Sequence, residues 1–285
     1  MKDRIAALAV IAAVSVAGAS ACSSGKPAAA KPSQNPSQLL SAAVKNAESA
    51  TSVVAATSIK TSQIPGAGAL GGLGLATSGT YTGQTKPSDL REFSGTVQAG
   101  GQSMGNIDLI STHDAAYANL PPVVKTLLHT TSKPWVKVPQ SELKSGGLMA
   151  AVLGEATSVN PLAFAKLLGE AKNPKIAGTA TVGGVSTTEV SGSVPASTAL
   201  AKLPSSLQKT FGQDGQGAIQ FKAWIDGSHN FKKLQISDSG YSGSASTQIG
   251  FTVSKLNQPV TIKTPPANQA STLTAKDLKG AIGGL

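Results

Sequence analysis

The sequence has 285 residues and a formal net charge of +10, from 24 lysines and arginines against 14 aspartates and glutamates. That length is enough for one sizeable domain with a real core, and the single cysteine, Cys22, excludes an internal disulfide. Arg4 and Arg91 are the only arginines and aromatic residues make up 4% of the chain, which argues against nucleic acid as a partner. The many lysines fit an anionic membrane surface or serve solubility alone.

Residues 1–21 have the pattern of a secretory signal peptide. Lys2 and Arg4 form a charged beginning, an apolar run follows over residues 5–17, and small residues end the segment. The apolar run is shorter than the roughly 20 residues that a helix needs to cross the hydrocarbon core. We therefore expect export and not a permanent transmembrane helix.

The motif Ala19-Ser20-Ala21-Cys22 resembles the lipobox of bacterial lipoproteins. In a lipobox the cysteine sulfur receives a diacylglyceryl group and becomes the mature N-terminus. Residues 22–36 are polar and rich in Pro, Ser and Ala, which predicts a disordered tether. We expect lipidation at Cys22, with acyl chains such as palmitate holding the protein at the extracytoplasmic face of the cell membrane. The alternative is ordinary cleavage after Ala21, with Cys22 left as a spare thiol.

Residues 37–265 form the expected single domain, which begins with a helix and a series of strands. Leu39, Leu40, Ala43, Val44 and Ala47 recur at helical spacing after Ser37, a candidate N-cap. Short runs rich in Val, Ile, Thr and aromatic residues follow, separated by Gly, Pro, Ser and Asp, which predicts an antiparallel meander. These runs cover residues 52–62, 78–85, 90–98, 105–112 and 114–120.

An uncharged, glycine-rich loop is expected between the first two strands, over residues 64–77. It carries Leu70, Leu73 and Leu75, and a connection of this length is usually functional or disordered. Because the loop is apolar, it could cover an apolar cavity or touch a membrane. The alternative is a loop that folds back onto its own core.

The middle of the chain changes to a helical period. A short helix that includes Leu128 starts at Pro121-Pro122, a strand covers residues 133–139, and Asn160-Pro161 divides two further helical stretches. The first stretch contains Leu148, Val152 and Leu153, and the second contains Leu162, Phe164, Leu167 and Leu168.

The last third of the chain returns to strands. A hairpin turns at Gly183-Gly184, a helix lies within residues 196–212, and a second hairpin turns at Asp226-Gly227. Final strands are expected at 247–257 and 259–265, and residues 266–285 are expected to form a flexible tail.

The sequence contains no constellation of catalytic or metal-binding residues above background. His113, His129 and His229 lack metal-ligand spacing, and no second cysteine exists to complete a zinc site. The nucleophile motif G-x-S-x-G is absent as well. We expect no enzyme activity, no cofactor and no metal; a hydrolase that pairs a serine with His113 or His229 is the weakest alternative.

The order of elements resembles that of the LppX/LprG-type lipoproteins of actinobacterial envelopes, which have a LolA-like fold. The resemblance covers most of residues 37–265, and four features carry it besides Cys22 and its tether: the opening helix, the strand "PWVKVP", the segment 182–196 and the hairpin 221–237. It implies an α+β fold in which a strongly curved antiparallel β-sheet, a half-barrel, wraps around helices and encloses an apolar cavity.

The same resemblance implies a membrane-anchored lipoprotein that binds acyl chains of a lipid or glycolipid and carries them across the cell envelope. A membrane transporter or another envelope protein would be a further partner, while the alternative function is an envelope sensor or scaffold that binds a protein. The expected cavity residues are Leu70, Leu73, Leu75, Leu128, Leu148, Val152, Leu153, Phe164, Leu167 and Leu168.

Overall fold

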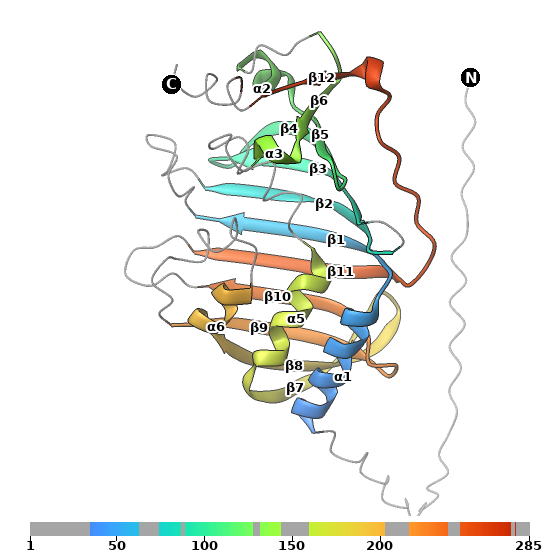
Figure 1. Ribbon diagram of the computed structural model, residues 1–285. Helices are drawn as coiled ribbons and strands as arrows, with labels where there is room; N and C mark the ends of the chain where they lie inside the picture. The colour runs from blue at the N-terminus through green and yellow to red at the C-terminus, as the bar shows by residue number, and fades with distance from the viewer. Residues whose placement is uncertain are drawn as a thin grey trace, which may run out of the picture. The chain divides into compact units, whose positions relative to one another are not determined.

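In the computed structural model, all the strands of the described residues lie in one twelve-stranded sheet (Figure 1). The structure describes residues 35–62, 74–86, 89–127, 132–143, 160–202, 217–238, 246–274 and 277. The strands are β1 (Ser52–Thr61), β2 (Leu75–Gln84), β3 (Leu90–Ala99), β4 (Gln102–Ser111), β5 (Ala115–Asn119), β6 (Trp135–Pro139), β7 (Lys172–Val182), β8 (Val185–Pro195), β9 (Ala218–Asp226), β10 (Phe231–Asp238), β11 (Thr247–Leu256) and β12 (Ala270–Thr272).

Two meanders make up this sheet and meet at its centre. Strands β1 to β6 follow one another outward in one direction, and β7 to β11 run inward from the opposite edge until β11 pairs with β1. All neighbouring strands are antiparallel except β12, which pairs with β6 in parallel. The sheet is open because β12 and β7 form its two edges. The curved antiparallel sheet expected from the sequence is therefore confirmed.

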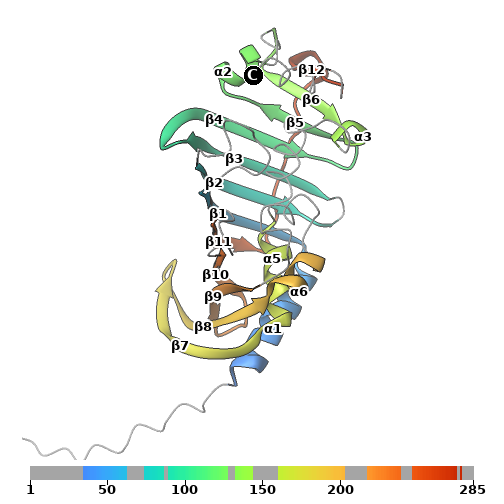
Figure 2. The same ribbon diagram turned by 90° about the vertical axis from the view of Figure 1, so that its left-hand side faces the viewer.

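The principal helices lie on one face of this sheet, which we call the inner face (Figure 2). The helical elements are α1 (Pro36–Ser49), α2 (Pro122–Leu127), α3 (Gln140–Leu143), α5 (Pro161–Leu167), η2 (Leu168–Glu170), α6 (Ala196–Lys202) and η3 (Ala267–Gln269). The Asn35 side chain caps α1 by accepting a hydrogen bond of 2.9 Å from the Ser37 N–H. No helix among the described residues is long and apolar enough to cross a membrane.

The inner face carries apolar side chains across most of its width. One row of directly paired residues crosses seven strands, from β11 through β1 to β6, and every member is buried. The row consists of Val253, Ala55, Tyr81, Phe93, Leu109, Ala118 and Val136. Alternation within each strand places these side chains together, because successive residues of a strand point to opposite faces.

The core divides into two clusters on this face. The first lies between α1, α5 and strands β8 to β11, β1 and β2. The second lies over β3 to β6, where Val124 of α2 and Leu143 of α3 pack against it. Each cluster buries the apolar side of one half of the sheet, and Tyr81 and Phe93, paired on β2 and β3, mark the boundary between them.

Two paired glycines sit at the same boundary. Gly79 of β2 lies opposite Gly95 of β3, and a Cβ atom at Gly79 would overlap the carbonyl oxygen of Ser94 and come within 2.6 Å of the Gly95 Cα. The backbones of β2 and β3 therefore approach each other more closely here than any larger residue allows.

Two regions near the C-terminus differ from expectation. Residues 259–265 are extended but form no strand, because β11 already has β1 and β10 on its two sides. Figure 1 shows this segment running past the strand ends toward η3. Residues 270–272, expected in a flexible tail, form β12, and Leu273 is buried in the second cluster.

The expected loop over 64–77 also ends earlier, since β2 begins at Leu75.

Replacing Gly79 with alanine tests the close approach of β2 and β3. We expect Gly79→Ala to lower the free energy of unfolding by about 1–3 kcal/mol or more, because the new Cβ has backbone and not a movable side chain in its way. Urea unfolding monitored by circular dichroism measures this. Gly227→Ala is the control, because a Cβ there meets nothing within 4 Å; equal stability of the two variants would contradict the proposed crowding.

Candidate functional site

The structure places four of the ten expected cavity residues. Leu75 begins β2 and is half-buried. Phe164 and Leu167 on α5, and Leu168 on η2, are buried in the first core cluster. The remaining six, Leu70, Leu73, Leu128, Leu148, Val152 and Leu153, lie outside the described residues, as does Cys22.

The helix α5 is positioned by the Asn160-Pro161 pair. The Asn160 side chain accepts a hydrogen bond of 2.9 Å from the Leu162 N–H, and Pro161 occupies the first turn, where its missing N–H leaves no bond unmade. This start directs Phe164 onto the sheet, where its ring centroid lies 5.4 Å from that of Phe251 at a tilt of 41°. Asn160-Pro161, which separates two helical stretches in the sequence, thus also sets where α5 begins on the inner face.

A small pocket lies where α1 and α5 meet the sheet. Its volume is about 20 Å³, room for about one water molecule, whereas pockets for drug-sized ligands measure about 300–1,000 Å³. It is lined by Asn46, Ala47, Pro161, Leu162, Ala165, Asn230, Phe231, Leu234, Phe251, Val253 and Leu256. The described helices therefore rest directly on the sheet, with side chains filling the space between them.

Polar contacts of Asn46 hold the rim of this pocket. The Asn46 side-chain amide donates to the backbone carbonyls of Ser228 and His229 at 3.0 and 3.1 Å, so α1 is joined to the turn between β9 and β10. The same amide lies 3.4 Å from the Asn230 side-chain oxygen. The pocket has apolar walls and one polar edge.

Tyr81 is an unexpected polar group on the inner face. Its side chain is buried, and its hydroxyl has no hydrogen-bond partner among the described residues. Burial raises the pKa of the Tyr81 hydroxyl well above its ordinary value, although the Arg91 guanidinium partly offsets this effect. Arg91 itself pairs with Asp89 at 2.6 Å. Sequence reasoning missed Tyr81 because an unpaired hydroxyl depends on neighbours from other strands.

Two of the three histidines occupy exposed turns. His113 lies between β4 and β5, and His229 lies in the β9–β10 turn with a left-handed backbone, at φ 61°. The part of the chain that the structure describes contains no group of three His, Cys, Asp or Glu residues that could hold a metal ion. His129 lies outside that part.

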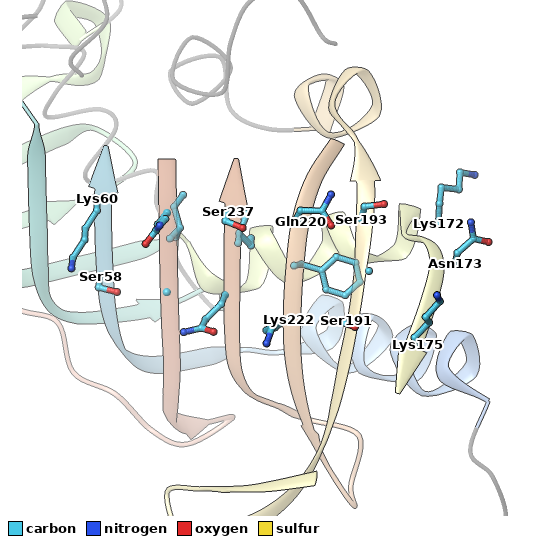
Figure 3. Close-up of a pocket in the computed structure, with 17 residues that line it drawn as sticks. Ser58, Lys60, Lys172, Asn173, Lys175, Ser191, Ser193, Gln220, Lys222 and Ser237 are labelled. Atoms are coloured by element: carbon cyan, nitrogen blue, oxygen red, sulfur yellow. The ribbon is translucent and has the colours of Figure 1, made fainter. Parts of the chain in front are cut away.

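A second hollow, of about 780 Å³, lies on the opposite, outer face of the sheet (Figure 3). Strands β1, β11, β10, β9, β8 and β7 line it, mostly with lysine, serine and glutamine residues and in part with Phe221, Ile236 and Ile249. Its lining is more polar than that of the pocket beneath α1 and α5, and the sequence pattern did not predict it.

These features define a class of fold: an open, strongly curved antiparallel sheet with helices on its inner face. The model of the LppX_LprAFG lipoprotein family matches residues 35–262, so the chain belongs to that lipoprotein family. The resemblance noted in the sequence is confirmed.

One solved structure shares this fold, and a second is similar to a lesser degree. The crystal structure of LprF from Mycobacterium bovis is similar with a TM-score of 0.52 and 17% sequence identity, covering 81% of this chain and 96% of that one. LppX from Mycobacterium tuberculosis is similar with a TM-score of 0.46 and 20% identity, covering 80% and 97%. Among curated proteins, no relative matches the chain.

The carboxylate of Glu92 gives a pH-dependent prediction. Burial raises the pKa of Glu92 above its ordinary value, and the nearby Asp108 carboxylate raises it further. The folded protein therefore favours protonated Glu92, and its stability falls as the pH rises and the charge forms. We expect Glu92→Gln to increase the melting temperature at pH 7 and the difference to close as the pH is lowered to about 3.

Thermal unfolding at a series of pH values measures this effect. Asp114→Asn, which removes an exposed carboxylate between β4 and β5, is the control for the loss of one negative charge. A Glu92→Gln variant that is less stable than the parent at pH 7 would contradict the prediction.

Proposed function

We propose that the protein is a membrane-anchored lipoprotein that binds acyl chains of a lipid or glycolipid on the inner face of its sheet and carries them across the cell envelope. The observation that carries this proposal is the apolar contact of α1 and α5 with the sheet, at a pocket whose walls consist almost entirely of aliphatic and aromatic side chains. Membership of the LppX_LprAFG lipoprotein family supports it.

The physical basis of binding is replacement of one apolar contact by another. When α1 and α5 separate from the sheet, Leu162 and Phe164 lose their contacts with Phe251 and its neighbours. An acyl chain restores the same apolar burial, worth about 0.8 kcal/mol for each methylene removed from water. Because such contacts have no direction, this site requires no polar motif, in keeping with the absence of one from the sequence.

Hydrogen bonds at the polar edge of the pocket limit how far α1 can move away from the sheet. Asn46 ties the C-terminal half of α1 to the β9–β10 turn through two backbone carbonyls. A hydrogen bond of this kind contributes about 0.5–1.5 kcal/mol to stability, so it can be broken and remade during ligand entry. In the proposed mechanism, the helices move while the strands keep their register.

A protein partner is the second candidate function, and the edge strand β7 favours it. Ile176 and Val185 are exposed large apolar residues on the β7–β8 hairpin, and β7 ends the sheet. However, two shifts of register interrupt β7, and bulges of this kind hinder the addition of another strand. We therefore rank the sensor or scaffold function below lipid carriage.

Native mass spectrometry of the full chain, expressed with its own signal peptide in an actinobacterial host, tests lipid binding directly. We expect a discrete added mass that dissociates and is recovered as lipid on extraction. The bare polypeptide mass, found again after incubation with envelope lipids, would contradict lipid carriage. Recovery of a bound protein instead would favour the sensor or scaffold.

A cavity-creating variant tests where the lipid binds. Leu162 lines the pocket and is buried, so Leu162→Ala should lower the free energy of unfolding by about 2–5 kcal/mol. Added lipid should raise the melting temperature of Leu162→Ala more than that of the parent, because the acyl chain fills the enlarged pocket. Differential scanning calorimetry with and without lipid measures both effects.

Leu109→Ala is the matched control. Leu109 is also a buried leucine, but it belongs to the second cluster, over β4. The same loss of stability is expected without additional rescue by lipid. Equal rescue of the two variants would place the lipid elsewhere.

The membrane anchor is tested at Cys22. We propose that this cysteine carries the acyl chains, so Cys22→Ser should abolish labelling by palmitate and release the protein from the membrane fraction into the medium. Immunoblotting of cell fractions measures the release. Ser23→Ala, one residue further along, should leave both properties unchanged, and a membrane-bound Cys22→Ser protein would contradict the assignment.

A further inference from the structure

The outer face of the sheet carries two continuous rows of polar residues across six strands. Each row consists of directly paired residues on β7, β8, β9, β10, β11 and β1, in that order. The first row is Lys175, Ser191, Lys222, Gln235, Gly250 and Ser58, and the second is Lys172, Ser193, Gln220, Ser237, Gln248 and Lys60. We call these twelve residues the outer strip.

All twelve line the hollow of about 780 Å³. Figure 3 shows labelled members of the strip on neighbouring strands, with Lys60 at one end and Lys172 and Lys175 at the other. With strands about 4.8 Å apart, a row across six of them is about 24 Å long. The strip consists of lysine, serine, glutamine and one glycine, and the hollow is also lined by Asn173, Gly192, Phe221, Ile236 and Ile249.

The strip carries uncompensated positive charge. Lys222 forms an ion pair of 3.2 Å with Glu189, a residue of β8 that does not belong to the strip. Lys60, Lys172 and Lys175 form no ion pair with any described residue, and no aspartate or glutamate lines the hollow. Charges placed at both ends, with a hollow between them, attract a negatively charged molecule that extends along the whole strip.

The remaining side chains define the chemistry of that molecule. Serine hydroxyls and glutamine amides both donate and accept hydrogen bonds, which suits a chain that also carries many hydroxyl groups. Lysine ammonium groups act as point charges toward phosphate or carboxylate groups. The lysines belong to a hollow and not to a protruding surface, so a narrow polymer reaches them more readily than a planar bilayer does.

We propose that the outer strip binds an extended anionic glycan, a polysaccharide with phosphate or carboxylate groups repeated along its chain. This site lies on the face opposite the apolar pocket and does not depend on lipid binding. A glycan on the outer face would hold the protein beside an envelope polymer while the inner face remains available to lipid.

Titration of the full chain with two charged glycans tests the proposal. It also shows whether the site recognises carboxylate or phosphate groups. The probes are polygalacturonate for carboxylate and phosphomannan for phosphate, with neutral dextran as the uncharged control. We expect saturable binding of at least one charged glycan in isothermal titration calorimetry, no binding of dextran, and weaker binding at higher salt.

A triple variant locates the site. Lys60→Gln, Lys172→Gln and Lys175→Gln together should weaken glycan binding by about tenfold or more, because three cooperating charge contacts are lost. The matched control replaces three exposed lysines elsewhere, Lys45, Lys86 and Lys263, with glutamine and so removes the same net charge. Its affinity should stay within about twofold of the parent, since exposed charges beyond a Debye length of about 10 Å are largely screened.

Three outcomes would overturn the proposal. The first is that neither charged glycan binds. The second is that both triple variants lose affinity equally, which would indicate a general effect of net charge. The third is that these lysines bind only vesicles of phosphatidylglycerol and phosphatidylcholine. Native mass spectra of the outer-strip variant should still show bound lipid, so failure here and failure of lipid carriage are distinguishable.

Discussion

A sheet of twelve strands has one apolar face to remove from water, and the described structure depends on how that face is covered. Buried side chains follow one another across the strands from Val253 to Val136, and each would be exposed on an isolated sheet. Two clusters of packing elements share the task, with α1 and α5 over one half and α2, α3 and Leu273 over the other. The paired Gly79 and Gly95 lie where the two halves meet.

This arrangement separates two kinds of surface on the same strands. In β11, Ile249 and Phe251 face the helices, while Gln248 and Gly250 belong to the outer strip. The inner surface relies on apolar contact, which is strong but without direction. The outer surface relies on charge and hydrogen bonding, which are directional and sensitive to salt. A single curved sheet can therefore present an apolar site and a polar site that do not compete.

Local features of the sequence predicted local structure well. Spaced leucines and alanines predicted α1, Asn160-Pro161 predicted the start of α5, and Gly183-Gly184 predicted the β7–β8 turn. These signals succeed because the helix cap, the proline and the turn act within a few residues. Alternation along a strand likewise predicts which residues share a face.

Features that depend on distant pairing could not be predicted. Nothing in residues 259–265 reveals that β11 already has two neighbours, and nothing near Ala270 reveals the free edge of β6. The outer strip appears only when six strands are placed in register. The buried Tyr81 hydroxyl, which has no hydrogen-bond partner among the described residues, was unpredictable for the same reason, since its surroundings come from several strands. The sequence therefore predicted most of the elements and the family, but not β12 or the polar outer surface.

The pairing of β1 with β11 also governs how the chain reaches its native state. Val53 pairs with Leu256, about two hundred residues later, so the two meanders can each form locally but cannot join until nearly the whole chain is present. Contacts of such long range slow folding. Until β11 arrives, β1 presents an open edge, and until β12 arrives, so does β6. The chain therefore passes through states whose exposed strand edges invite self-association, which makes assistance during folding most valuable before β11 and β12 are in place.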